Sequence, residues 1–202
     1  MSSSLGVILA GGLATRMGGG DKGLLPLGSS TLLSHVIDRL TPQVDGIALN
    51  ANGDGSRFAH LGFPVIADSI DGFAGPLAGV LAGLDWAAEQ GANSIVTAAA
   101  DTPFFPSDLA ARLHREGGGM AHPLVIAATP DPKRCTSRHP TFGLWPVALR
   151  EDLRAALLGG VRKVVQWTDS HDGRLAMFPV EQVDPFFNVN TPEDLAQAEA
   201  ML

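Results

Sequence analysis

Hydrophobic and polar positions form two kinds of segment along this chain. Short apolar runs, such as residues 5–10 (LGVILA) and 94–101 (SIVTAAAD), have the length and composition of buried strands. Longer segments between them carry apolar residues at helical spacing, and over residues 31–40 these residues fall on one face. By these criteria we predict strands over residues 5–10, 46–52, 63–68, 94–101, 122–128, 141–146 and 174–180, and helices over residues 31–40, 75–90, 107–119, 147–158, 161–170 and from 192 onward.

Two of the helices begin with residues suited to capping. We expect Ser107 to be the N-cap of the helix over 107–119 and Thr191 to be the N-cap of the last helix. Pro192 and Asp194 then fall in the first turn of that last helix, where a missing N–H costs nothing and a carboxylate is favoured.

Strands that alternate with helices of ten or more residues predict an α/β protein with a mostly parallel sheet and helices on both faces. A length of 202 residues suits one domain, so we expect a single three-layer sandwich of Rossmann-like type over residues 1–202. Such sheets bind ligands outside the carboxyl ends of their strands. A glycine-rich loop follows the first predicted strand, and Asn50 with Asn52, and Asp101, lie at the ends of two others, so all are expected at that edge.

Composition narrows the class of protein. With 45% hydrophobic and 17% charged residues the chain is that of a globular protein, and no apolar stretch approaches the roughly 20 residues of a membrane span. The single cysteine excludes an intramolecular disulfide, and the first residues lack the pattern of a secretory signal, so we expect a cytoplasmic location. A net charge of −7 argues against a nucleic-acid or membrane-surface partner.

The charges are unevenly distributed. Residues 58–111 contain no Lys or Arg but include six acidic residues, and basic residues lie before and after this segment. An acidic middle with basic flanks could hold a metal ion and bring anionic groups to it. Ordinary solvated faces would give the same distribution, so charge alone does not decide between these interpretations.

The loop after the first strand belongs to the stretch VILAGGLATRMGGGDKGLLPLG, residues 7–28. Gly18 to Gly23 spells G-x-G-x-x-G, but this motif starts too far beyond the strand for a dinucleotide fingerprint, and no G-K-[ST] of a P-loop follows. What remains is a glycine-rich loop with two cations: Arg16 can bind phosphate through two parallel hydrogen bonds, and Lys22 as a compact charge. The alternative is a surface loop with incidental cations.

Asp101 follows a run of small and apolar residues and precedes TPFF, which places it at a strand end. Mg²⁺ is commonly held by one or two carboxylates with substrate phosphates completing its shell. Helix capping is the alternative role, and it is disfavoured because Ser107 is expected to cap the next helix.

Five motifs, taken together, make the chain resemble the molybdenum cofactor guanylyltransferases, nucleotidyltransferases that make molybdenum guanine dinucleotide. They occur in the family's order: LAGGLATRMGGGDKGLL, DSIDGFAGPLAG, AADTPF, RHPTFGLW and NVNTPEDL. The resemblance covers almost the whole chain. Three glycines stand before Asp21-Lys22, where the family has a pair, and the signature is otherwise intact.

The resemblance implies a role for each matching residue. It assigns GTP binding to Leu9, Ala10, Gly11, Gly12, Lys22, Asn50, Asp68 and Asp101. It makes Lys22, Arg16 and Asp101 the catalytic residues, with Asp101 and Asn190 facing a Mg²⁺ cofactor. Asn188, Asn190 and His139 would lie near molybdopterin, although His139 could equally belong to a turn.

The implied fold is the Rossmann-like nucleotide-diphospho-sugar transferase fold, as one nucleotidyltransferase domain whose N-terminal part binds the nucleotide and whose C-terminal part binds molybdopterin. The implied reaction transfers GMP from GTP to molybdenum–molybdopterin and releases pyrophosphate. The implied partners are GTP and molybdopterin or its molybdenum form, without nucleic acid or membrane. We expect a monomer with transient contacts to other cofactor-biosynthesis proteins or molybdoenzyme chaperones.

Three alternatives remain at this point. One is a molybdopterin cytidylyltransferase, the second a sugar-1-phosphate type of nucleotidyltransferase, and the third a non-catalytic nucleotide-binding or carrier protein that keeps the fold. The preference for guanine follows from the resemblance and not from any single residue.

Overall fold

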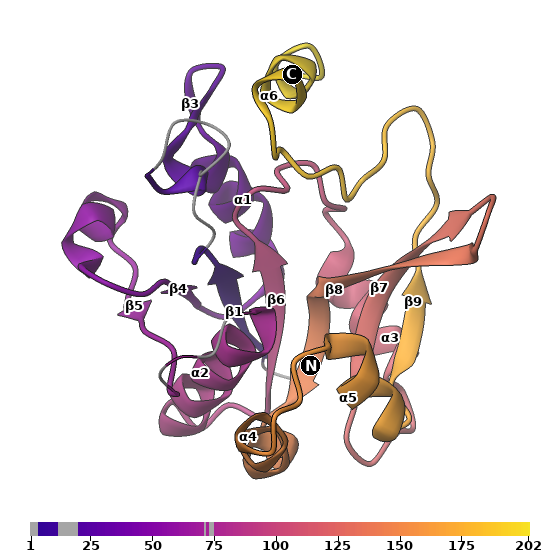
Figure 1. Cartoon of the computed structure of the whole chain (residues 1–202). Helices are drawn as coiled ribbons and strands as arrows, with labels where there is room; N and C mark the ends of the chain where they lie inside the picture. The colour runs from indigo at the N-terminus through magenta and orange to yellow at the C-terminus, as the bar shows by residue number, and fades with distance from the viewer. Residues whose placement is uncertain (1–3, 12–19, 71, 73–74) are drawn as a thin grey trace.

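The apolar runs form one central sheet. The structure, a computed structural model, describes residues 4–11, 20–70, 72 and 75–202, and within these residues the sheet has the strand order β5-β4-β1-β6-β8-β7-β9 (Figure 1). Its strands are β1 (Ser4–Leu9), β4 (Ile47–Asn50), β5 (Val65–Ile66), β6 (Ser94–Ala99), β7 (Val125–Asp131), β8 (Cys135–Pro146) and β9 (Arg174–Met177). A separate antiparallel pair, β2 (Pro26–Leu27) and β3 (Ser30–Thr31), follows the glycine-rich loop.

The sheet is mostly parallel, as predicted. Strands β5, β4, β1 and β6 run in one direction, and β9 is parallel to β7. The exception is β8, which is antiparallel to both β6 and β7. The polar stretch between the two predicted strands also belongs to the sheet, because β7 and β8 extend through it as a hairpin. At its tip, the Asp131 carboxylate accepts hydrogen bonds from the N–H groups of Lys133 and Arg134.

Helices cover both faces of the sheet, which gives the expected three layers. The α-helices are α1 (Leu32–Leu40), α2 (Pro76–Glu89), α3 (Leu109–Glu116), α4 (Arg150–Leu158), α5 (Val164–Ser170) and α6 (Pro192–Glu199). The short 3₁₀ segments are η2 (Lys22–Leu24), η3 (Thr41–Gln43), η4 (Gly55–Leu61) and η5 (Val147–Leu149). Helices α1 and α3 pack on one face, and α2, α4 and α5 on the other (Figure 1). Within the described residues, none of these helices has both the length and the apolar character needed to cross a membrane.

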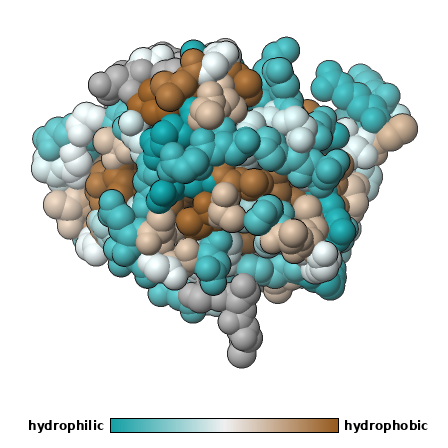
Figure 2. Space-filling view, turned by 90° about the horizontal axis from the view of Figure 1, so that it is seen from below, coloured by the Kyte–Doolittle hydropathy of each residue, from teal (hydrophilic) through white to brown (hydrophobic). Residues whose placement is uncertain are grey.

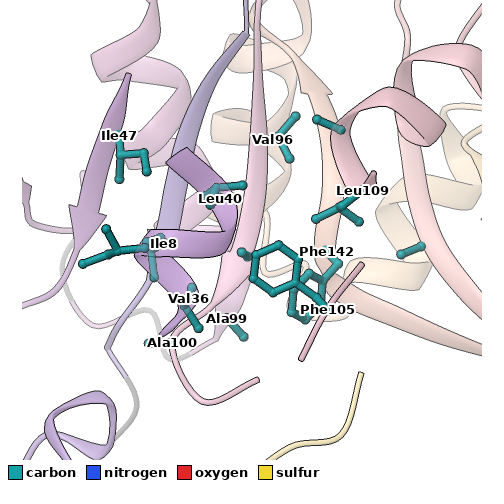
Figure 3. Packing of buried hydrophobic residues seen from close by; sticks show 14 of the residues in the cluster. Ile8, Val36, Leu40, Ile47, Val96, Ala99, Ala100, Phe105, Leu109 and Phe142 are labelled. Atoms are coloured by element: carbon teal, nitrogen blue, oxygen red, sulfur yellow. The ribbon is translucent and has the colours of Figure 1, made fainter. Parts of the chain in front are cut away.

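Side chains that alternate between the two faces of each strand contribute to two hydrophobic cores, one on each side of the sheet. Ile8 joins the core under α1 and α3, whereas its neighbour Val7 joins the core under α2, as expected for side chains that alternate across a strand. Figure 3 shows the first of these cores, with Val36 and Leu40 of α1 packed against the sheet. Both leucine and valine are fully buried, and burial of a side chain of this size stabilises a fold by roughly 1.5–3 kcal/mol.

One capping prediction is confirmed and one is wrong. Thr191 caps α6: its hydroxyl accepts from the N–H of Asp194, whose carboxylate accepts from the N–H of Thr191. Ser107 does not cap α3, which begins at Leu109 without a side-chain cap from its own N-terminus. Instead Gln43, on η3, accepts a hydrogen bond of 3.0 Å from the N–H of Ala110. A residue distant in sequence therefore accepts the hydrogen bond from the start of α3 that Ser107 was expected to accept.

The C-terminal segment returns to the carboxyl ends of the central strands. Helix α6 lies at that end of the molecule, beside the β2–β3 pair, as the yellow ribbon at the top of Figure 1 shows. Val189 packs in a small apolar cluster with Leu27 and Leu32, and its N–H donates to the carbonyl of Asp101 at 2.9 Å. Residues distant in sequence therefore meet where β6 ends.

Candidate functional site

A cavity of about 400 Å³ opens at the carboxyl ends of β1, β4 and β6. Its wall is built from strand ends, from the N-terminus of α2 and from the C-terminal segment. The lining residues are Leu9, Gly11, Asn50, Asn52, Asp68, Gly75, Pro76, Ala99, Asp101, Thr141 and Asn188. The site lies where a parallel α/β sheet is expected to bind its ligand.

Lys22 contacts two other predicted site residues, Asp101 and Asn190. Its Nζ donates to Asp101 Oδ2 at 2.6 Å and to Asn190 Oδ1 at 2.5 Å. The side chains of Lys22 and Asp101 are only 11% and 22% exposed, so this ion pair is largely shielded from water. A carboxylate oxygen and an amide oxygen therefore converge on one cation.

The same two oxygens could hold a metal ion. The described residues contain no cluster of three or more His, Cys, Asp or Glu side chains that could enclose a metal. Mg²⁺ does not require such a cluster, because it is usually bound by one or two carboxylates while water and phosphate oxygens complete its shell. Asp101 and Asn190 already face a positive charge at short distance, so their donor set suits this ion.

Asn190 is held by the start of α6. Its backbone N–H donates to Asp194 Oδ2 at 2.8 Å, and the same carboxylate oxygen accepts from Thr191 N–H. These hydrogen bonds, the one from Asn190 above all, hold the pKa of Asp194 below its ordinary value, so this carboxyl is ionised at neutral pH. The capping box of α6 thus fixes the backbone that presents Asn190 to Lys22.

Asp68, which also lines the cavity, is oriented by two asparagines. Asn50 Nδ2 donates to Asp68 Oδ1 at 2.9 Å, and Asn52 Nδ2 donates to Asp68 Oδ2 at 2.8 Å. Asn52 Oδ1 also accepts from the N–H of Asp68, so this side chain contacts both the backbone and the carboxylate. Asn50 itself packs so tightly on α2 that a Cβ on Gly79 would lie 2.2 Å from its Oδ1.

Arg57 contacts both the residue before Lys22 and the segment that orients Asp68. Its Nε donates to Asp21 Oδ2 at 2.5 Å, directly before Lys22, and its Nη2 donates to the carbonyl of Asn52 at 2.8 Å. The guanidinium also lies over the ring of Phe58, 4.5 Å from the centroid. The segment that carries Lys22 is therefore tied to the segment that orients Asp68.

The predicted residues differ in how closely they approach the cavity. Leu9, Gly11, Asn50, Asp68, Asp101 and Asn188 line it, and Lys22 and Asn190 adjoin it through Asp101. Ala10 is buried behind the lining, with its N–H bonded to the carbonyl of Asn50 at 2.8 Å. Gly12 and Arg16 lie outside the described residues.

His139 lies apart from the cavity lining. Its Nε2 is 2.9 Å from the Thr129 hydroxyl, and its ring stacks on Phe186 with centroids 4.2 Å apart. Burial lowers the pKa of His139, with a smaller opposing effect from Asp184, so the ring is neutral at pH 7. Thr141, two residues further along β8, does line the cavity. The sequence motif containing both residues indicated this region, but not which residue lines the cavity.

Two further residues of the site were not singled out from the sequence. Thr102, beside Asp101, is fully buried, and its hydroxyl lies 3.2 Å from Asp101 Oδ1 and in contact with Asn188 Oδ1. Its position directly after the strand-end aspartate is the signal that could have indicated it. Arg57 had no such signal, because its contacts with residues 21 and 52 arise only in the folded chain.

A second cavity, of about 730 Å³, lies at the opposite end of β1, between η3 and α3. Ser4, Asp45, Asp108 and His114 are among its lining residues, and those that the structure describes include neither Lys nor Arg. Figure 2 shows the molecule from this lower end, where hydrophobic residues are exposed in separate groups among hydrophilic ones. The described lining of the smaller cavity also lacks Lys and Arg, but Lys22 adjoins that cavity through its ion pair with Asp101. A site for a nucleoside triphosphate needs a cation close by, so the smaller cavity is the better candidate.

Comparison with known proteins identifies relatives that cover nearly the whole chain. The family model described as a MobA-like NTP transferase domain matches residues 6–173. The chain is 54% identical over 198 residues to the molybdenum cofactor guanylyltransferase of Rhodopseudomonas palustris strain HaA2, with 96% of this chain and 90% of that protein covered. It is 50% identical over 199 residues to the molybdenum cofactor guanylyltransferase of Nitrobacter hamburgensis, with 97% and 93% covered.

Solved structures share the fold. The molybdopterin-guanine dinucleotide biosynthesis protein A of Archaeoglobus fulgidus superimposes with a TM-score of 0.71 at 24% sequence identity. The superposition covers 98% of this chain and 97% of that chain, so the likeness extends over the whole of both.

Proposed function

The chain belongs to the molybdenum cofactor guanylyltransferase family, and on that premise we propose that its cavity binds GTP and transfers GMP to the molybdenum–molybdopterin cofactor. The products are pyrophosphate and the guanine dinucleotide form of the cofactor. The observation that carries the proposal is the convergence of Lys22, Asp101 and Asn190 beside a cavity at the carboxyl ends of the sheet.

In this proposal the two walls of the cavity divide the nucleotide between them. The wall made by Asn50 and Asp68 holds the nucleoside, because it offers a carboxylate already oriented by two amides. The Lys22 side holds the phosphates, with the backbone of Leu9 to Gly12 beside them. Arg16 adds a second cation on the phosphates.

The reaction then joins two phosphates. A terminal phosphate oxygen of molybdopterin attacks the α-phosphorus of GTP, forming a new P–O bond while the bond between the α-phosphorus and the bridging oxygen breaks. The attacking oxygen is ionised near neutral pH, so no strong general base is needed. Lys22 and Arg16 stabilise the charge that develops on the departing pyrophosphate, which is catalysis by positioning and electrostatics.

Mg²⁺ is proposed as the cofactor, bound by Asp101 and Asn190. When bound there it would neutralise phosphate charge as a Lewis acid. For that, the Lys22 ammonium must leave the two oxygens and contact the phosphates instead. The backbones of Asp101 and Asn190 are each held by a hydrogen bond that does not involve Lys22, which supports their remaining in place when Lys22 moves.

The function is tested by following pyrophosphate release from GTP in the presence of molybdenum–molybdopterin and Mg²⁺. Loss of one such charged group costs about 3–4 kcal/mol of transition-state stabilisation, so Lys22→Ala and Asp101→Ala should each reduce turnover by about a hundredfold or more. Lys133→Ala, which removes the same charge from the exposed hairpin tip, is the matched control and should retain full turnover. Near-normal turnover in Lys22→Ala or Asp101→Ala would contradict the assigned role.

The same assay with CTP separates guanylyl from cytidylyl transfer. Faster product formation from CTP than from GTP would favour the cytidylyltransferase alternative. Tight nucleotide binding without pyrophosphate release would indicate a non-catalytic binding protein.

A further inference from the structure

We propose that Thr102 is a positioning residue of the transfer reaction, whose hydroxyl passes a hydrogen bond from the Asn188 amide to the Asp101 carboxylate. This relay rests on the proposed function, because it concerns how the metal-facing carboxylate is held. Thr102 does not itself reach the cavity: its side chain is fully buried, whereas Asp101 and Asn188 both line the cavity.

The contacts around the hydroxyl place three oxygens together. Thr102 Oγ1 lies 3.2 Å from Asp101 Oδ1 and in close contact with Asn188 Oδ1. A hydroxyl has only one proton, so it cannot donate to a carboxylate oxygen and an amide oxygen at the same time. If the Asn188 amide oxygen faces the hydroxyl, both neighbours of Thr102 Oγ1 are acceptors. Only one of them can receive the proton, and the other oxygen then contacts Oγ1 without a hydrogen bond.

A half-turn of the Asn188 amide removes this conflict. It exchanges the amide oxygen for the NH₂ group without moving any other heavy atom. Asn188 then donates to Thr102 Oγ1, and the hydroxyl donates its single proton to Asp101 Oδ1. Each contact then has one donor and one acceptor, and the carboxylate accepts the single proton of the hydroxyl.

The relay fixes the rotation of the carboxylate. Thr102 holds Oδ1, and Oδ2 is left facing Lys22 at 2.6 Å, the position proposed for the cation. The Val189 N–H, on the residue next to Asn188, also donates to the Asp101 carbonyl at 2.9 Å. The C-terminal segment therefore orients Asp101 through both its backbone and its side chain.

Thr102→Val tests the relay, because valine keeps the shape of threonine and replaces the hydroxyl with a methyl group that cannot form a hydrogen bond. The experiment measures how tightly the GTP-bound protein binds Mn²⁺, a paramagnetic substitute for Mg²⁺. The electron paramagnetic resonance signal of free Mn²⁺ reports how much of the ion remains unbound. Residues that orient metal ligands typically contribute 10–100-fold in affinity, so Thr102→Val should weaken Mn²⁺ binding about tenfold or more. Thr102→Ser restores the hydroxyl and should restore the affinity.

Two comparisons separate the possible outcomes. Asp101→Ala should abolish the Mn²⁺ site, and retention of tight binding in that variant would overturn the proposed metal role itself. If Asp101→Ala loses the site while Thr102→Val binds Mn²⁺ as the wild type does, the relay is overturned and the proposed function stands. Equal losses in Thr102→Val and Thr102→Ser would also overturn it, since they would reflect packing.

A double-mutant cycle tests the partner. If Asn188 acts on the carboxylate through Thr102, Asn188→Ala should weaken Mn²⁺ binding in the wild type but cause little further loss in Thr102→Val. If the losses of Mn²⁺ affinity in Asn188→Ala and Thr102→Val add fully in the double variant, Asn188 acts independently of Thr102 and the relay is overturned.

Discussion

Lys22 illustrates how one side chain can serve two states of the site. In the structure its ammonium lies between Asp101 and Asn190, where it satisfies the charge of a carboxylate that is only 22% exposed. The divalent cation proposed above would use the same two oxygens. The free protein therefore presents a site already neutralised by its own cation, and phosphates that attract Lys22 would vacate it.

This arrangement predicts that Lys22→Met binds Mn²⁺ more tightly than the wild type when no nucleotide is present. Methionine keeps the apolar stem and removes the ammonium, leaving Asp101 without its partner, and the expected gain is about tenfold, or roughly 1.4 kcal/mol. Titration of the nucleotide-free proteins with Mn²⁺ measures it. The double variant Lys22→Met/Asp101→Ala is the control and should lose the site. Equal affinity of Lys22→Met and wild type would contradict competition between lysine and metal.

At the scale of elements, α2 uses two glycines for different purposes. A Cβ on Gly79 would lie 2.2 Å from Asn50 Oδ1 and 2.9 Å from Leu9 Cδ2, both in residues that line the cavity. A Cβ on Gly83, one turn later, would instead meet Val7 and Ile95 in the core at 2.8 and 2.9 Å. The same helix therefore packs closely against the site at one turn and against the core at the next.

Alanine at these two positions should consequently have different effects. Gly79→Ala should weaken GTP binding about tenfold or more by displacing the Asn50 amide from Asp68, a loss of roughly 1.4 kcal/mol. Gly83→Ala, the matched control, should lower stability by about 1–3 kcal/mol through overpacking while GTP affinity is unchanged. Calorimetric titration with GTP and thermal unfolding measure the two effects. Unchanged GTP affinity in Gly79→Ala would contradict the role given to this close approach.

The elements also show what the sequence could predict. Apolar spacing located the strands and helices, since burial imposes the same periodicity everywhere along a chain. It did not reveal that β8 runs antiparallel, because alternation of side chains carries no strand direction. It also placed the cap of α3 on Ser107, whereas Gln43 from η3 satisfies that end. Asp101 and Lys22 could be identified from local motifs, but the contacts of Arg57 and Thr102 depend on segments that meet only after folding.

For the molecule as a whole, the site joins segments that are far apart in the chain. Lys22, Asp101 and Asn190 come from the first, middle and last parts of the sequence and meet in one cluster. A ligand bound there interacts with all of them, whereas the unfolded chain has no such cluster. Ligand binding should therefore stabilise the entire domain against unfolding.

GTP with Mg²⁺ at about a hundred times its Kd should raise the free energy of unfolding by about 2.7 kcal/mol. In a chain of this size each kcal/mol raises Tm by about 2–4 °C, which gives a rise of roughly 5–10 °C. Removal of the metal with a chelator should lower this rise, and in Asp101→Ala the chelator should have no effect on it. Thermal scans with and without chelator measure the difference. A chelator effect that persists in Asp101→Ala would place the metal elsewhere.

The hydrogen bond from Val189 to the carbonyl of Asp101 has a consequence for how the protein is made. During translation the sheet strands around β6 leave the ribosome well before residues 188–190 are synthesised. A message cut short by a premature stop before that point would yield a product with the glycine-rich loop and Asp101 but without Asn188 and Asn190. The proposed metal and nucleotide site would thus be completed only late in synthesis, and incomplete products would lack part of it.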